Sequence, residues 1–139
     1  MASIIALEVV TPTGPVVKVD VDQVEAPSVF GEFGVLPGHL PLLAALEAGV
    51  VRYRSAGKLV AIAVSQGFAE AGPDRVTILT ESAIDGSEVD TASVKSDRDA
   101  LLKQLESVSA DASNEYEELL RKRKWLDAQL EAARESGKN

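Results

Sequence analysis

The chain has 139 residues, of which 45% are hydrophobic and 26% are charged, and its formal net charge is −8 at pH 7. This length allows one ordinary domain with an appendage, or two very small domains. The acidic balance argues against nonspecific nucleic-acid binding, which requires a basic surface that displaces counterions. The absence of cysteine excludes a disulfide framework and most structural zinc sites.

The distribution of residue types divides the chain near Ser87. Residues 1–86 hold all six prolines, nine of the ten glycines and 15 charged residues, whereas residues 87–139 hold one glycine, no proline and 21 charged residues. Glycine and proline separate short strands, and their absence together with dense charge favours solvated helix. We therefore predict a β-rich domain over residues 1–86 and a helical hairpin over residues 87–139.

The start of the chain and its apolar runs bear on targeting. The first ten residues, MASIIALEVV, lack the basic region of a signal peptide. No apolar run approaches the roughly 20 residues that span a bilayer. We expect neither a signal peptide nor direct membrane insertion.

The first part of the chain alternates apolar and polar residues with a period of two. Val17, Val19 and Val21 alternate with charged residues, and Val51 and Tyr53 alternate with arginines. This pattern predicts strands with one buried and one wet face. Short strands at this spacing predict an antiparallel sandwich or barrel, because a parallel sheet needs intervening helices for which there is no room.

Two glycine-containing turns are predicted within this part. A turn at residues 55–58 would fold residues 59–64 back on residues 50–54. The Gly-Pro-Asp-Arg sequence at residues 72–75 predicts a second tight connection. Both turns favour antiparallel neighbours.

The most distinctive segment is Gly31–Leu43, which holds three glycines and two prolines among large apolar residues. This composition predicts a rigid turn without regular structure that orients Phe33 and Leu36. His39 is the single histidine in the chain, and no cysteine or phosphate-binding glycine motif accompanies it. A general base needs a nucleophile and an orienting partner, so we interpret His39 as a loop residue rather than as the base of a small hydrolase.

The period changes to 3.6 residues in the tail, which predicts two helices. Residues 107–114, rich in serine, aspartate and asparagine, separate them, and either Ser87 or Asp90 is predicted to cap the first helix. The narrow apolar stripes indicate a hairpin that needs a docking surface. The stripe residues are Val94, Leu101, Leu102, Leu105 and Val108 in the first helix and Tyr116, Leu119, Leu120, Leu126, Leu130 and Ala133 in the second.

The Gly31–Leu43 segment, together with residues 46–51 and 67–70, resembles the epsilon subunit of bacterial and chloroplast F-type ATP synthases, whose mitochondrial counterpart is called delta. The resemblance extends over nearly the whole chain. It implies a β-sandwich of about ten strands followed by a two-helix hairpin. It also implies a non-catalytic central-stalk subunit of a proton-translocating synthase, without a cofactor, at the cytoplasmic face of a bacterial inner membrane.

The resemblance further implies partners and contact residues. The sandwich would bind the gamma subunit and the ring of c subunits, and so couple ring rotation to ATP synthesis. The residues implied at this contact are Gly31, Glu32, Phe33 and His39. The hairpin would either fold against the sandwich or extend along gamma to the beta and alpha subunits, where it restrains ATP hydrolysis.

A basic run in the second predicted helix consists of Arg121, Lys122, Arg123 and Lys124. The first two have glutamates four residues earlier, an orientation that favours ion pairs within the helix. The last two lack such glutamates, and we expect them to face an acidic loop of the beta subunit that the resemblance implies. A solvated, self-paired helix surface is the alternative.

Nucleotide binding is where the chain departs from the resemblance. Family members that bind ATP on the folded hairpin carry Ile/Leu-Asp-x-x-Arg-Ala at the start of the first helix. The corresponding residues here keep Asp90 but have Ser93 in place of the arginine. A guanidinium is the group best suited to pairing with phosphate. We therefore expect weak ATP binding and interpret Asp90 as a helix cap.

A second class of function fits the same two-part organisation. The chain could act as a free-standing β-sandwich adaptor whose hairpin binds another helical partner. Copurification separates the two hypotheses, because a stalk subunit requires gamma and an adaptor does not.

Overall fold

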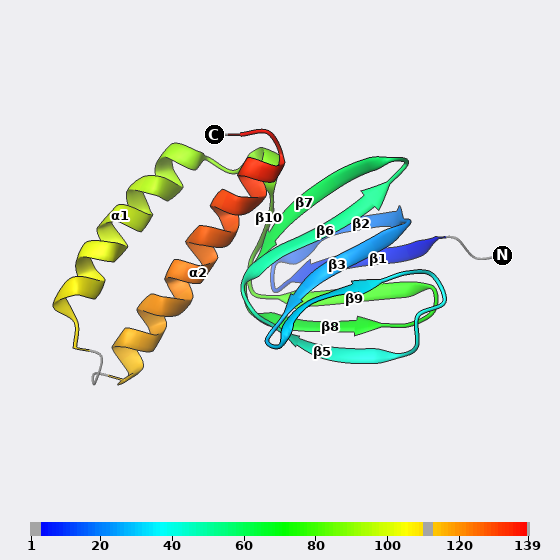
Figure 1. Ribbon diagram of the computed structural model, residues 1–139, viewed down its shortest axis with the longest axis horizontal. Coiled ribbons are helices and arrows are strands. Elements are labelled where there is room, and N and C mark those ends of the chain that lie inside the picture. The colour runs from blue at the N-terminus through cyan, green and yellow to red at the C-terminus, as the bar shows by residue number, and fades with distance from the viewer. Residues whose placement is uncertain (1–3, 110–112, 139) are drawn as a thin grey trace.

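The structure is a computed structural model that describes residues 4–109 and 113–138. Figure 1 shows a sandwich of strands with a helical hairpin on one side. A short 3-10 helix, Gly86–Glu88, connects the two parts. The mainly β fold with a helical C-terminal hairpin confirms the predicted fold class.

The described residues form ten strands, and hydrogen-bonded neighbours follow the order β10-β7-β6-β3-β5-β8-β9-β1-β2, with β4 paired to β3. This order runs through two layers that meet where β3 pairs with β5 (Figure 1). The strands are β1 (Ile5–Thr11), β2 (Gly14–Val21), β3 (Gln23–Ser28), β4 (Gly31–Val35), β5 (Leu42–Leu46), β6 (Gly49–Ser55), β7 (Lys58–Val64), β8 (Gly67–Ala71), β9 (Arg75–Thr80) and β10 (Ala83–Asp85).

Alternation along the strands builds the core as predicted. In β2 the charged residues are exposed while Val21 is buried, and in β6 Val51 and Tyr53 are buried. The fully buried side chains between the layers are mostly branched aliphatic residues. They include Ile5, Leu7, Val9, Val24, Val35, Ile62, Val64, Val76 and Ile78.

The predicted turn at residues 55–58 joins β6 to β7 with Ser55 directly opposite Lys58. Its two central residues, Ala56 and Gly57, have positive φ angles of 51° and 79°, as a two-residue hairpin turn requires. At the second predicted turn the backbone N–H of Gly72 donates to the carbonyl oxygen of Arg75 at 2.8 Å, and β8 pairs with β9. Both predicted hairpins are confirmed.

One strand pair departs from the antiparallel expectation. β1 and β9 are hydrogen-bonded parallel neighbours, whereas the remaining pairs are antiparallel. The strands β2–β8 lie between them in the chain. The sandwich itself therefore supplies the long connection that a parallel pair needs, and no crossover helix is required.

The expectation that Gly31–Leu43 lacks regular structure is wrong for its last two residues, which begin β5, and for its first five. The first five form β4, which pairs with β3 in antiparallel register from Ser28 opposite Gly31 to Val24 opposite Val35. Gly31, the first residue of β4, lies at the turn from β3 and has a φ angle of 119°. Glycine adopts such a positive φ angle without steric cost. Only residues 36–41 between β4 and β5 are irregular.

The hairpin consists of α1 (Thr91–Ser107) and α2 (Ser113–Glu135). Asp90 caps α1, because its carboxylate accepts from the backbone N–H of Ser93 at 3.1 Å, whereas Ser87 lies in the 3-10 helix. Residues 110–112 of the predicted break lie outside the described residues. The interface between the helices is built by Val89, Val94, Leu101, Leu105, Leu119, Leu126, Leu130 and Ala133.

Candidate interaction surfaces

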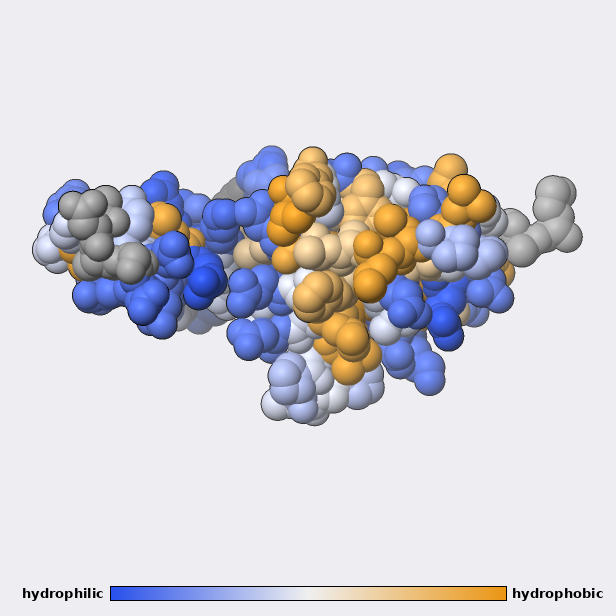
Figure 2. Space-filling view, turned by 90° about the horizontal axis from the view of Figure 1, so that it is seen from below, coloured by the Kyte–Doolittle hydropathy of each residue, from blue (hydrophilic) through white to orange (hydrophobic). Residues whose placement is uncertain are grey.

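The outer face of the layer opposite the hairpin carries exposed apolar side chains. Leu43 on β5, Phe68 on β8 and Leu79 on β9 are 71%, 57% and 52% exposed. The register places Phe68 directly between Ala45 and Leu79, so these side chains share one face. Figure 2 shows the resulting apolar patch across this side of the sandwich. We call Leu43, Ala45, Phe68 and Leu79 the apolar sheet face.

Strand alternation separates the residues of the predicted ring-facing group. Glu32 is exposed, but the next residue, Phe33, is half-buried and packs against the sandwich core. Side chains of successive strand residues point to opposite faces, so Glu32 and Phe33 do not share a surface. Phe30, at the tip of the turn from β3 to β4, is 98% exposed and was missed by the sequence analysis. The signal for it was an aromatic residue directly before a turn glycine.

His39 lies in the loop between β4 and β5, away from β4 itself. Its Nδ1 donates to the carbonyl oxygen of Leu40 at 2.5 Å, and the neighbouring Gly38 N–H donates to Pro73. Within the described residues no ion pair or hydrogen bond joins His39 to Glu32. His39 is therefore a half-buried loop residue whose ring satisfies the adjacent backbone.

The hairpin docks through α2 on the outer face of β6 and β7. Ala128 and Ala132 of α2 are buried against Val50, Ala61 and Ala63, and Trp125 packs at the border of this cluster. We call this cluster the docking interface. Small side chains on both elements let the helix approach the sheet closely. The sequence analysis predicted that the hairpin needs a docking surface, but it did not identify this second face of α2.

Gly86 allows the last turns of α2 to approach the end of the sandwich. A Cβ atom at this position would lie 2.1 Å from the carbonyl oxygen of Ala132. Gly86 itself is buried. Only a residue without a side chain fits between the sandwich and the helix backbone at this point.

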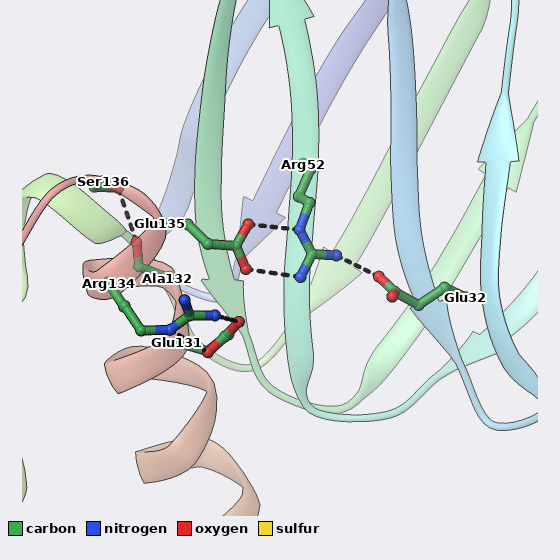
Figure 3. Close-up of polar contacts among 7 residues, drawn as sticks. All are labelled: Glu32, Arg52, Glu131, Ala132, Arg134, Glu135 and Ser136. Atoms are coloured by element: carbon green, nitrogen blue, oxygen red, sulfur yellow. Dashed lines mark hydrogen bonds and ion pairs between the residues drawn. The ribbon is translucent and has the colours of Figure 1, made fainter.

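Arg52 on β6 joins the sandwich to the C-terminal end of α2 (Figure 3). Its Nε and Nη2 donate to the two carboxylate oxygens of Glu135 at 2.6 and 2.7 Å, and its Nη1 donates to Glu32. The side chains of Arg52 and Glu135 are only 21% and 17% exposed. The hydrogen bonds to Glu135 are the main cause that raises the pKa of Arg52 above its usual value. The sequence analysis assigned Arg52 only to the wet face of a strand.

A neighbouring pair lies one turn earlier on α2. Arg134 donates to both carboxylate oxygens of Glu131, with a distance of 3.0 Å from Nε (Figure 3). These hydrogen bonds lower the pKa of the Glu131 carboxyl. Both residues are more exposed than the Arg52–Glu135 pair, so their ion pair lies at the rim of the docked helix.

The basic run is exposed along its whole length and makes ion pairs within the chain. Arg121 lies 3.9 Å from Glu117, as the spacing predicts. Arg123 lies 3.7 Å from Asp127. Lys124 pairs with Glu47 in the turn between β5 and β6. Arg123 therefore has an acidic partner four residues later in α2, and Lys124 has one on the sandwich. The sequence analysis considered only glutamates four residues earlier, so it found neither.

The start of α1 offers no arginine to a phosphate group. Asp90 and Ser93 are exposed and occupied with the helix cap. Lys138 donates from Nζ to the carbonyl oxygen of Val89 at 2.9 Å. Lys138, a cation beside the helix start, thus has a backbone partner.

Residues 4–109 and 113–138 contain neither a metal-ligand cluster nor a membrane-spanning helix. In this part of the chain no group of three or more histidine, cysteine or acidic side chains is arranged to hold a metal ion. None of the described helices is both long and apolar enough to cross a membrane.

A β-sandwich with an exposed apolar face and a docked C-terminal helical hairpin defines the class of protein by its fold. The comparisons with known proteins specify the family. Residues 4–86 match the family described as ATP synthase, Delta/Epsilon chain, beta-sandwich domain. The chain belongs to this family of ATP synthase delta and epsilon chains.

Relatives extend the match into the hairpin. The chain is 43% identical over 132 residues to the ATP synthase epsilon chain of Magnetococcus marinus, covering 95% of this chain and 96% of that one. It is 44% identical over 103 residues to the ATP synthase epsilon chain of Anoxybacillus flavithermus, covering 74% and 77%. A chain in the structure of the Euglena gracilis mitochondrial ATP synthase, OSCP/F1/c-ring, has the same fold, with a TM-score of 0.77 at 22% identity over 94% of this chain and 83% of that chain.

Proposed function

We propose that the chain is a non-catalytic central-stalk subunit of a proton-translocating ATP synthase that couples ring rotation to ATP synthesis. Membership of the delta and epsilon chain family carries this proposal. The chain would work at the cytoplasmic face of a bacterial inner membrane, held there by its protein partners. The surfaces described above are suited to protein contacts.

The apolar sheet face is the proposed contact with the gamma subunit. Its side chains are spread over three adjacent strands, so they form a continuous surface rather than scattered single residues. Monomeric proteins rarely leave such contiguous apolar patches uncovered unless the patch binds a partner. Burial of apolar surface contributes about 25 cal/mol per Å², so covering this face would stabilise the complex with gamma.

The turn between β3 and β4 is the proposed contact with the ring of c subunits. Phe30 projects from the tip of the turn, and Glu32 provides an exposed carboxylate two residues later. An exposed aromatic ring and a nearby charge suit a surface that meets the polar loops of another subunit. Phe33 belongs to the sandwich core instead, so its substitution would affect folding before it affects the ring.

The hairpin is the proposed regulator of ATP hydrolysis. In the docked arrangement, Arg123 and Lys124 pair with Asp127 and Glu47. Undocking removes Glu47 from Lys124 and exposes the cation to an acidic surface of the beta subunit. The inhibitory arrangement would therefore be the extended one, and the docked one would permit hydrolysis.

The test compares two aspartate substitutions of exposed apolar residues on opposite layers. Phe68→Asp changes the apolar sheet face, whereas Leu59→Asp changes a residue of β7 that is 48% exposed on the other layer. We expect Phe68→Asp to weaken binding of purified gamma at least about tenfold, since a charge would be buried without a partner, and Leu59→Asp to leave it nearly unchanged. Equal binding by both variants and the parent would exclude the apolar sheet face. Stable purification of a chain that never binds gamma would favour the adaptor alternative.

A further inference from the structure

Arg52 is a single cation held between two carboxylates from different parts of the chain (Figure 3). Glu135 is the last residue of α2, and Glu32 belongs to β4. The Glu135 side chain is 17% exposed, whereas that of Glu32 is 58% exposed. One guanidinium cannot neutralise two carboxylates, so Glu32 and Glu135 compete for the positive charge of Arg52 and repel each other across it.

Apolar packing and ion pairs together hold the hairpin on the sandwich. α1 packs on α2 and lies on the side of α2 that faces away from the sheet (Figure 1). The docking interface is built largely from alanines, which bury little surface each. Two ion pairs add to it, Arg52–Glu135 and Lys124–Glu47.

The two ion pairs differ in their surroundings. The Lys124 and Glu47 side chains are 54% and 44% exposed, so water and salt screen their attraction. The Arg52–Glu135 pair is bidentate and mostly shielded from water, which makes it the stronger and more specific of the two. Of the two ion pairs, Arg52–Glu135 therefore contributes more to the position of the C-terminal end of α2.

We infer that Arg52 is a latch whose single positive charge is shared between Glu135 and Glu32 while the hairpin is docked. In this arrangement Glu135 takes part of that charge, so Glu32 keeps part of its negative charge for a cationic group of a partner. When the hairpin leaves, Arg52 pairs with Glu32 alone and neutralises it. By thermodynamic linkage, a partner cation that binds Glu32 favours the docked hairpin to the same extent that docking favours the partner.

The partner in this coupling rests on the proposed function, because only there does Glu32 face another subunit. The latch itself lies within one chain and can be tested on the isolated protein. The chain has no cysteine, so a cysteine placed in the docking interface reports its opening without a background reaction. Ala61 is suitable because it is 3% exposed and belongs to the docking interface on β7.

The experiment measures how fast a thiol reagent modifies Ala61→Cys in the full-length chain. When closing is faster than modification, the rate is proportional to the population of the undocked state, even if that population is very small. We expect Glu135→Gln and Arg52→Gln each to raise the rate about tenfold, and the double variant to raise it no further. The matched control Lys124→Gln should raise it less than about threefold. Glu32→Gln should lower the modification rate, because it removes the carboxylate that competes with Glu135 for Arg52 and that repels Glu135.

Several results would overturn the latch. One is that Glu135→Gln raises the modification rate no more than Lys124→Gln does. Another is that the effects of Arg52→Gln and Glu135→Gln on this rate add up in the double variant. If Glu32→Gln leaves the modification rate unchanged or raises it, Glu32 does not compete with Glu135 for Arg52. No synthase is present in this measurement, so failure here leaves the gamma-binding test untouched.

Discussion

Gly86→Ala is the substitution that most directly tests how closely α2 approaches the sandwich. The added Cβ atom would lie 2.1 Å from the carbonyl oxygen of Ala132, 2.5 Å from its carbonyl carbon and 2.5 Å from Oγ of Ser136. Ordinary contacts at such positions begin near 3.4 Å, so the helix backbone must move away by more than 1 Å. The backbone of Gly86 does not have a positive φ angle, so alanine causes no strain of its own there.

The movement would disrupt two sets of contacts. Ala132 is fully buried in the docking interface, and Glu135, three residues later, holds Arg52 at 2.6 and 2.7 Å. Overpacking of this kind costs about 1–3 kcal/mol. At about 1.4 kcal/mol for each factor of ten, the ratio of docked to undocked hairpin should fall about five- to 150-fold.

Tryptophan fluorescence provides the assay, because Trp125 is the single tryptophan of the chain and packs at the border of the docking interface. We expect Gly86→Ala to shift its emission to longer wavelength while the circular dichroism of the strands stays the same. Gly72→Ala is the matched control, since a Cβ atom there meets nothing within 4 Å. If Gly86→Ala keeps the emission and melting curve of the parent, α2 does not pack against Gly86 as the structure has it.

Three further predictions concern the two parts of the chain. Residues 1–86 alone should melt cooperatively with a β-type circular dichroism spectrum, because their core is built from their own strands; a largely helical or non-cooperative fragment would contradict this. In the assembled synthase, deletion of residues 87–139 should raise ATP hydrolysis and leave the sandwich attached, and charge reversal of Arg123 and Lys124 should reproduce part of that rise, more at low salt. Unchanged hydrolysis at all salt concentrations would exclude an inhibitory hairpin. Calorimetry should find only weak ATP binding, because Ser93 cannot replace a guanidinium, and tight saturable binding would refute this.

Local patterns in the sequence were sufficient for the elements that depend on near neighbours. Alternation placed Val51 and Tyr53 in the core, because side chains on a strand point to opposite faces in turn. The turn at residues 55–58 followed from a glycine that accepts a positive φ angle. Asp90 was one of two predicted caps, and its carboxylate reaches the N–H of Ser93 three residues away. Each of these features is decided within a few residues of chain.

The assignment of the candidate contact surface was only partly predictable. The sequence analysis grouped Glu32 with Phe33 because the resemblance implied one contact loop, whereas pairing of β4 with β3 sends the two side chains to opposite faces. Phe30 emerged as the exposed aromatic residue only once the position of the turn was known. An exposed and a buried aromatic residue look alike in a sequence when strand boundaries are uncertain.

Other features were decided by tertiary structure alone. Arg52 and Glu135 are 83 positions apart, and no local pattern indicates that a strand arginine meets the last residue of a helix. The parallel pairing of β1 with β9 likewise joins segments that are distant in the chain. The sequence by itself determined the alternation of apolar and polar positions along the strands and the turns at residues 55–58 and 72–75, since these depend on backbone geometry and neighbouring side chains. Which faces meet depends on how all segments pack together, so only the folded chain set the docking interface and gave Arg52 its two partners.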